Sequence, residues 1–239
     1  MVVQHNMAAS NANRQLGIST NTLSKSTEKL SSGYRINRAA DDAAGLSISE
    51  KMRSQIRGLN KAVSNAQDGI SLVQVAEGAL NETHSILQRM NELATQAAND
   101  TNTSTDRNAL QKEMDQLTSE IDRIRSTTQF NSMNLLDGSF TGKELQVGAL
   151  SGQMISISIG NMNSSKLKIS GLKVSSFSSA GKAMAAIQKA INSVSTQRSK
   201  LGALQNRLEH TINNLNTTSE NTSAAESRIR DVEYGYRDG

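Results

Sequence analysis

The chain has 239 residues, enough for one or two domains, yet it is only 3% aromatic and contains no tryptophan, proline or cysteine. Without cysteine, neither a disulfide framework nor a thiolate zinc site can form. The net charge of +4 is small and no run of Lys or Arg is present, so the composition gives nucleic-acid binding little support.

The N-terminal segment predicts a helix over about residues 5–32 with a thin apolar stripe. The stripe consists of Val3, Met7, Leu16, Leu23 and Leu30, which are separated by Asn, Gln, Ser and Thr. A single helix with so few apolar positions is marginal in water. The first twenty residues do not resemble a cleavable secretory signal, and no segment approaches the roughly 20 apolar residues of a membrane span. We therefore expect no membrane partner.

A helix break follows in the stretch "LSSGYRINRAADDAAG", residues 30–45. Gly33 can adopt the left-handed conformation that ends a helix. Either Asp41 or Asp42 can cap the next helix, because a carboxylate there accepts from free backbone N–H groups and favours the positive end of the helix dipole. On local sequence alone, a capped loop on a solvated surface explains this stretch.

Residues 45–98 carry the strongest pattern, an apolar stripe in alternating steps of four and three. It runs through Met52, Ile56, Leu59, Val63, Ala66, Ile70, Val73, Leu80 and Leu87, with the polar residues Glu77 and His84 at two of its positions. Such spacing is typical of coiled coils. A helix of this length would be roughly 80 Å long and could not bury its stripe against itself.

Two further stripes supply helical partners, over residues 106–126 and 180–230. The polar stretch 98–108 predicts a turn and a helix cap between the first two helices. Between the last two, apolar and polar residues alternate over 144–160 around Ser151-Gly152, which predicts a β-hairpin, and residues 166–174 can add a strand. The expected fold is mainly α: an elongated antiparallel helical bundle of long coiled-coil-like helices with a small β-hairpin.

No constellation of catalytic or metal-binding residues is visible. His5, His84 and His210 are far apart and none has a second ligand at metal-binding spacing. Asp41 and Asp42 are adjacent, so their side chains diverge, and capping explains them. No serine lies in a nucleophile elbow. We expect no enzyme, no cofactor and no metal.

Four motifs in order resemble bacterial flagellin: "LSSGYRINRAADDAAGLSIS", "NAQDGISLVQVAEGALNE", "TQFNSMNLLDG" and "LGALQNRLEHTINNL". The resemblance extends from Met1 to about Val232. It implies a secreted structural protein of the bacterial flagellum that polymerises into the filament and serves motility. The implied partners are other flagellin subunits, the flagellar export chaperone and the filament cap. The run 139–178 is too short for the outer variable domains of larger flagellins.

The resemblance divides the chain into three regions. Residues 1–38 would be the filament-core helix and its connector, 39–232 the helical domain with its hairpin, and 233–239 an atypical tail. Flagellins typically continue with another helix that pairs with the N-terminal one. Here the last seven residues, Glu233 to Gly239, have neither the apolar periodicity nor the length for that helix, so we expect residues 1–32 to be mobile in the isolated protein and the chain not to polymerise unaided.

The resemblance also implies recognition by the host Toll-like receptor that senses flagellin. The matching residues are Arg89, Leu93 and Gln96 on one face of the long helix, with Glu113 approaching from the next helix. An alternative for Leu93 is burial against a third helix. Two other functions stay open: a hook–filament junction protein, which shares the terminal signatures, and a helical coiled-coil adaptor.

Overall fold

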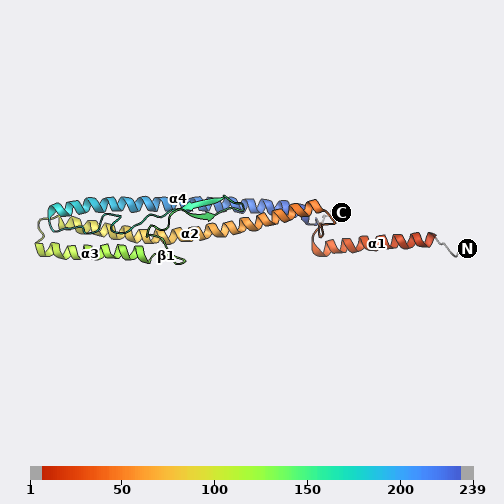
Figure 1. Ribbon diagram of the computed structural model, residues 1–239, viewed down its shortest axis with the longest axis horizontal. Coiled ribbons are helices and arrows are strands. Elements are labelled where there is room, and N and C mark those ends of the chain that lie inside the picture. The colour runs from red at the N-terminus through yellow and green to blue at the C-terminus, as the bar shows by residue number, and fades with distance from the viewer. Residues whose placement is uncertain (1–6, 233–239) are drawn as a thin grey trace, which may run out of the picture. The chain divides into compact units, whose positions relative to one another are not determined.

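The computed structural model describes residues 7–232, and Figure 1 shows their elements. The helices in this part of the chain are α1 (Met7–Ser32), α2 (Ala43–Ala97), α3 (Ser104–Thr127) and α4 (Phe177–Arg230). The strands are β1 (Gln129–Phe130), β2 (Met133–Asn134), β3 (Lys143–Gln146) and β4 (Met154–Ile157). The mainly α fold class and all the predicted helices are confirmed, with boundaries within three residues for those not touching the undescribed ends. The expected tail, 233–239, lies outside the described residues.

The chain forms two compact units. Within the described residues, one contains residues 7–60 and 216–232, and the other contains residues 61–215. Both α2 and α4 contribute to each unit, because each helix runs across the boundary between the two units. The domain division expected at residue 38 concerns layers of a filament and stays a prediction.

In the unit formed by residues 61–215, α2 lies antiparallel to both α3 and α4 (Figure 1). The heptad stripe of α2 forms the centre of the core, where Val73, Leu80 and Leu87 are all 0% exposed. α3 and α4 contribute their own stripes to this core, including Met114, Ile121, Ile187, Val194 and Leu201. Leu, Ile and Val at these positions fill the space between helices without aromatic residues from α2 or α4.

The polar residues of the α2 stripe are half-buried and interact with their neighbours. Glu77 pairs with Arg198 of α4, with 3.5 Å between Oε1 and Nη2. His84 Nε2 lies 3.2 Å from Gln88 Nε2, one helical turn further. Thus Glu77 joins α2 to α4, whereas His84 joins neighbouring turns of α2.

The hairpin predicted at 144–160 is confirmed, with β3 pairing antiparallel to β4 in the register Leu145↔Ile155. Ile155 and Ile157 face the core while Ser156 between them is exposed, as the alternation predicted. A smaller hairpin, β1–β2, turns through Asn131 and Ser132, both with positive φ.

The strand expected at 166–174 is wrong. This segment consists of turns, with φ of 58° at Lys168 and 69° at Gly171. No strand pairs with it: the N–H groups of residues 167–169 donate to backbone carbonyls of residues 163–165. Further along, Gln111 of α3 donates to the Leu172 carbonyl and accepts from the Val174 N–H. None of the helices in residues 7–232 has the length and hydropathy needed to cross a lipid bilayer.

Candidate functional site

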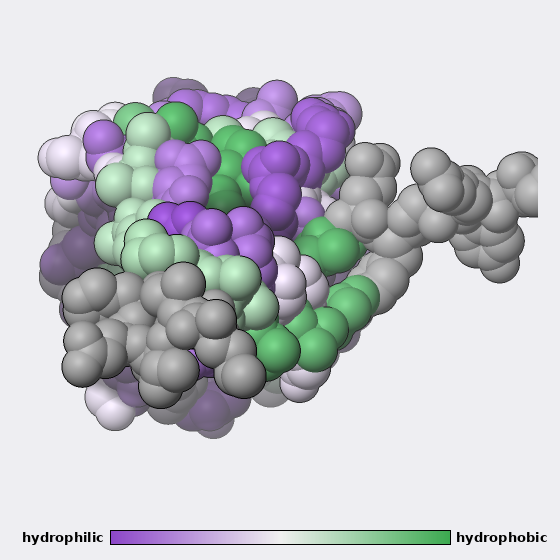
Figure 2. Space-filling view, turned by 90° about the vertical axis from the view of Figure 1, so that its right-hand side faces the viewer, coloured by the Kyte–Doolittle hydropathy of each residue, from purple (hydrophilic) through white to green (hydrophobic). Residues whose placement is uncertain are grey.

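α1 exposes its apolar residues. None of its residues is buried, and the exposed fractions are 68% for Leu16, 68% for Leu23 and 57% for Leu30. These leucines recur every seven residues, so they share one face of the helix. Figure 2 shows hydrophobic residues standing at the surface beside hydrophilic ones. A repeated leucine face of this kind is a surface that another helix can cover.

The segment that directly follows α1 in sequence forms backbone hydrogen bonds with the end of α4. The Arg35 N–H donates to the Arg230 carbonyl at 2.7 Å, and the Val232 N–H donates to the Gly33 carbonyl at 2.9 Å. The Arg230 guanidinium lies 4.8 Å from the ring centre of Tyr34 and pairs with Glu50 of α2 at 2.8 Å. We call these contacts the terminal joint.

Gly33, Asp41 and Asp42, which the sequence analysis assigned to the break between α1 and α2, have different roles there. Gly33 has φ of 74° and follows the last residue of α1, with its N–H donating to the Lys29 carbonyl. Asp42 precedes α2 and its Oδ1 accepts from the Gly45 N–H at 2.8 Å, which is helix capping.

Asp41 instead closes the turn before the cap. Its Oδ2 accepts from the N–H groups of Arg38 at 3.0 Å and Asn37 at 3.2 Å. These two backbone hydrogen bonds hold the pKa of Asp41 below its ordinary value, because they stabilise the carboxylate. The two aspartates therefore order consecutive parts of one connector.

The surface around Arg89 brings together residues of α2 and α3. Arg89 Nη2 lies 2.9 Å from Glu113 Oε1, and Arg89 Nη1 lies 3.2 Å from Glu92 Oε2. Hydrogen bonds to these carboxylates raise the pKa of Arg89 above its ordinary value. Gln96 is exposed on the same helix and, with Asn91 and Thr95, helps to line a shallow hollow of about 640 Å³.

Leu93 does not share that exposure. Its side chain is 0% exposed and belongs to the core formed with α3 and α4. The structure thus gives the alternative reading of Leu93, burial among helices, and leaves Arg89, Gln96 and Glu113 at the surface. Leu93 follows Arg89 by one helical turn and packs in the core beside the exposed residues.

Arg107 is a structural residue that the sequence reasoning missed. Its guanidinium donates to the carbonyls of Ala97 and Asn99 and pairs with Asp100 at 2.9 Å. It therefore satisfies free carbonyl groups at the end of α2 and fixes the turn into α3. A lone arginine in the first turn of a helix carries no sequence signal for such a role.

No group of three or more His, Asp or Glu residues within 7–232 is arranged to hold a metal ion. His210 lies on the exposed surface of α4, and His5 is outside the described residues. What residues 7–232 offer are surfaces: the leucine face of α1, the terminal joint and the Arg89 surface.

Known proteins match the chain along nearly its whole length. The model of the bacterial flagellin N-terminal helical region matches residues 3–141, and that of the C-terminal helical region matches residues 184–236. A flagellin of Halalkalibacterium halodurans is 54% identical over 98% of this chain and 86% of its own length. A flagellin of Bacillus subtilis is 48% identical over 98% of this chain and 88% of its own length.

Solved structures agree. The crystal structure of Bacillus cereus flagellin superposes with a TM-score of 0.58 at 33% identity, covering 68% of this chain and 94% of that one. A structure described as a flagellar hook-associated protein of Vibrio parahaemolyticus has a TM-score of 0.68 at 13% identity, covering 80% and 100%, which shows a shared fold alone. By the matches to both helical-region models and by its identity to flagellins, this chain belongs to the bacterial flagellin family.

Proposed function

We propose that this protein is a structural subunit of the bacterial flagellar filament, exported from the cell and assembled through its terminal helices. The observation that carries the proposal is the leucine face of α1. Leu16 and Leu23 are each 68% exposed, although burying such a side chain is worth about 2 kcal/mol. Packing of α1 against helices of neighbouring subunits would remove this surface from water. The proposal includes the export chaperone and the filament cap as partners.

The test is incorporation of the labelled protein into filaments growing from flagellar seeds, together with unlabelled subunits of a related flagellin. We expect Leu23→Asp to abolish incorporation, because an unpaired charge would lie in a helix–helix contact. Asn21→Asp is the matched control: it adds the same charge on the opposite face of α1 and should incorporate like the parent. The filament role is wrong if the parent fails to sediment with the filaments, or if both variants behave alike.

A second proposed role is recognition by the host Toll-like receptor for flagellin at the Arg89 surface. This role is supported by the exposed ion pair between Arg89 and Glu113, which places residues of α2 and α3 in one patch with Gln96 nearby. Buried arginines are frequent energetic centres of protein interfaces. A receptor carboxylate could replace Glu92 as the second partner of the guanidinium.

Arg89→Ala is expected to weaken receptor binding at least about tenfold, in the range typical of interface arginines. Arg123→Ala is the control, since Arg123 also forms an exposed ion pair, with Glu120, elsewhere on α3. Surface plasmon resonance gives the affinities, and circular dichroism checks that both variants keep their helices. Equal affinity of Arg89→Ala and the parent would refute this assignment.

A further inference from the structure

The charged residues are distributed unevenly along this chain, although its net charge is small. Between Glu144 and Glu209 there is no acidic residue, while the same stretch contains eight basic ones. These are Lys166, Lys168, Lys173, Lys182, Lys189, Arg198, Lys200 and Arg207. Only Arg198, which faces Glu77, forms an ion pair within residues 7–232.

Four of these residues lie in a row along α4. Lys182, Lys189, Lys200 and Arg207 follow steps of 7, 11 and 7 residues. At 3.6 residues per turn, each such step returns to within about 20° of the same face. All four side chains are exposed. The row spans roughly 38 Å of helix at 1.5 Å per residue. We call it the cationic row.

The cationic row borders two hollows on the unit formed by residues 61–215. Lys182 and Lys189 line one of about 430 Å³, where Lys166 and Lys168 approach from the turn segment and Ser193 adds a hydroxyl group. The aliphatic part of its wall comes from Leu167, Ala185 and Ala186.

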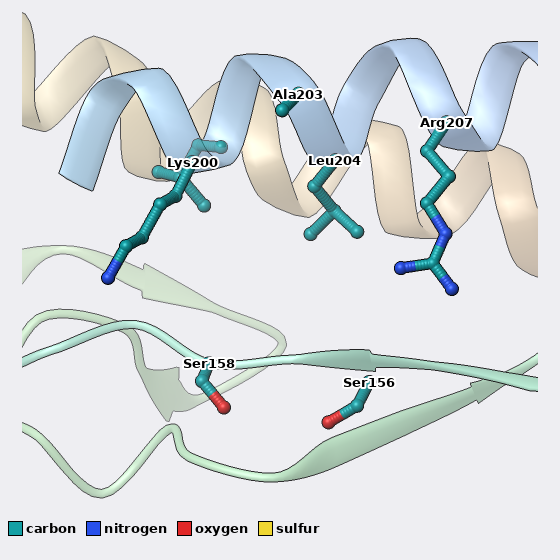
Figure 3. Close-up of a pocket in the computed structure, with 7 residues that line it drawn as sticks. Ser156, Ser158, Lys200, Ala203, Leu204 and Arg207 are labelled. Carbon is teal, nitrogen blue, oxygen red and sulfur yellow. The ribbon is translucent and has the colours of Figure 1, made fainter. Parts of the chain in front are cut away.

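The second hollow, of about 310 Å³, lies between α4 and the β-hairpin. Figure 3 shows Lys200 and Arg207 extending from α4 toward Ser156 of β4 and toward Ser158, which follows that strand. Both hollows are of a size that admits one or two sugar rings, and both combine cations with hydroxyl groups.

We propose that the cationic row is a binding site for a linear acidic polysaccharide, one that carries sulfate or carboxylate groups at regular intervals. A linear polyanion can contact cations over the whole row, and its sugar hydroxyls can pair with the serines of the hollows. The lysine charges need no fixed geometry, which suits a flexible polymer. Single-stranded nucleic acid fits less well, because the row and its hollows contain no aromatic side chain on which bases could stack.

Two acidic residues, Glu144 and Asp122, pair with residues in or close in sequence to the hollows. Glu144 of β3 lies opposite Ser156 in the hairpin and is exposed beside the second hollow. It should repel a polyanion. Asp122 of α3 accepts two hydrogen bonds, at 2.9 and 2.7 Å, from Ser164, which lies two residues before Lys166 in sequence, so the Asp122 carboxylate is already engaged.

The experiment measures binding of fluorescent dextran sulfate to the full chain by anisotropy over a series of salt concentrations. If the four cations of the row and also Lys166 and Lys168 engage the polymer, six charges are neutralised. The slope of log K against log salt should then be about −4, since each neutralised charge adds about −0.7 on a single-stranded polyanion. A second series of measurements uses polygalacturonate, which carries carboxylates. Comparing its affinity with that of dextran sulfate shows whether the site prefers carboxylate or sulfate groups. Neutral dextran should not bind.

Replacing Lys182, Lys189, Lys200 and Arg207 together by Gln leaves two of the six cations, so the slope should fall to about −1.4 and binding should weaken at least about a hundredfold at low salt. The matched control replaces Lys25, Lys51, Lys61 and Lys112 by Gln, which removes the same charge elsewhere and should leave most binding intact. Glu144→Gln should strengthen binding, a gain that a damaged fold would not produce.

Three results would overturn the proposal. Equal losses in the row variant and the control variant would mean that only net charge matters. Tighter binding of a single-stranded oligonucleotide of equal charge would assign the row to nucleic acid. Unchanged polysaccharide binding with lost filament incorporation in the row variant would make it a contact between subunits. Because binding is measured on the unassembled protein, its outcome does not depend on the filament role.

Discussion

A single glycine sets the geometry at the start of α2. The Gly45 N–H donates to the capping carboxylate of Asp42, and a Cβ built on Gly45 would collide with Asp42 Oδ2 and lie 2.8 Å from Ile36 Cδ1. Ile36 is only 2% exposed and has little room to move. The missing side chain therefore allows the cap and a buried apolar contact to coexist.

Gly45→Ala should lower the free energy of unfolding by about 1–3 kcal/mol, the usual cost of overpacking. Gly78→Ala, in the middle of the same helix, is the control, because nothing lies within 4 Å of a Cβ there. It should stabilise the protein by about 0.5–1 kcal/mol, since alanine favours helix. Urea unfolding followed by circular dichroism measures both. Effects of the same sign would contradict the steric argument.

Among the elements, α1 differs from the other helices because its described residues are not buried. Helices gain most of their stability from packing, and an isolated helix of 26 residues with few apolar positions is marginal. α3 is two residues shorter, yet it buries Met114 and Ile121 and begins with a capping box between Thr103 and Asp106. The difference lies in partners rather than in length.

We therefore expect limited proteolysis of the unassembled protein to remove α1 first, leaving a core that begins near Arg35. The terminal joint should protect the chain beyond that point, since Arg35 bonds to the last turn of α4. Mass spectrometry of the fragments identifies the cleavage sites. Cleavage within α3 before α1 would show that burial does not control the local stability of this chain.

The sequence predicted the elements whose partners repeat along the chain and missed those whose partners do not. Heptad spacing was enough for α2, since every turn meets a neighbouring helix in the same way. Residues 166–174 alternate as a strand does, but Leu172 and Val174 are hydrogen-bonded by Gln111, 61 or more residues away in sequence. The Arg89 and Glu113 pair followed from family resemblance, whereas the burial of Leu93 needed the packed helices.

At the scale of the whole molecule, the core of the unit formed by residues 61–215 carries most of the buried apolar side chains named above. Leu80→Ala should cost about 2–5 kcal/mol, because Leu80 is 0% exposed at its centre. Val75→Ala is the control on the same helix, as Val75 is 41% exposed. Its effect should stay near 0.5 kcal/mol. Thermal unfolding separates the two, and equal shifts would mean that α2 does not depend on this core.

The terminal joint has a consequence for the order in which the protein matures. It joins the Gly33–Arg35 segment to residues 230–232, so a newly made chain cannot close it until residues 230–232 have been made. The loop it closes is long, but loop entropy grows only with the logarithm of length, by about 0.6 kcal/mol per doubling. The long sequence separation therefore delays formation of the terminal joint but adds only a small free-energy cost to it. A chain that has not yet reached residue 230 keeps the segment after α1 without these hydrogen bonds.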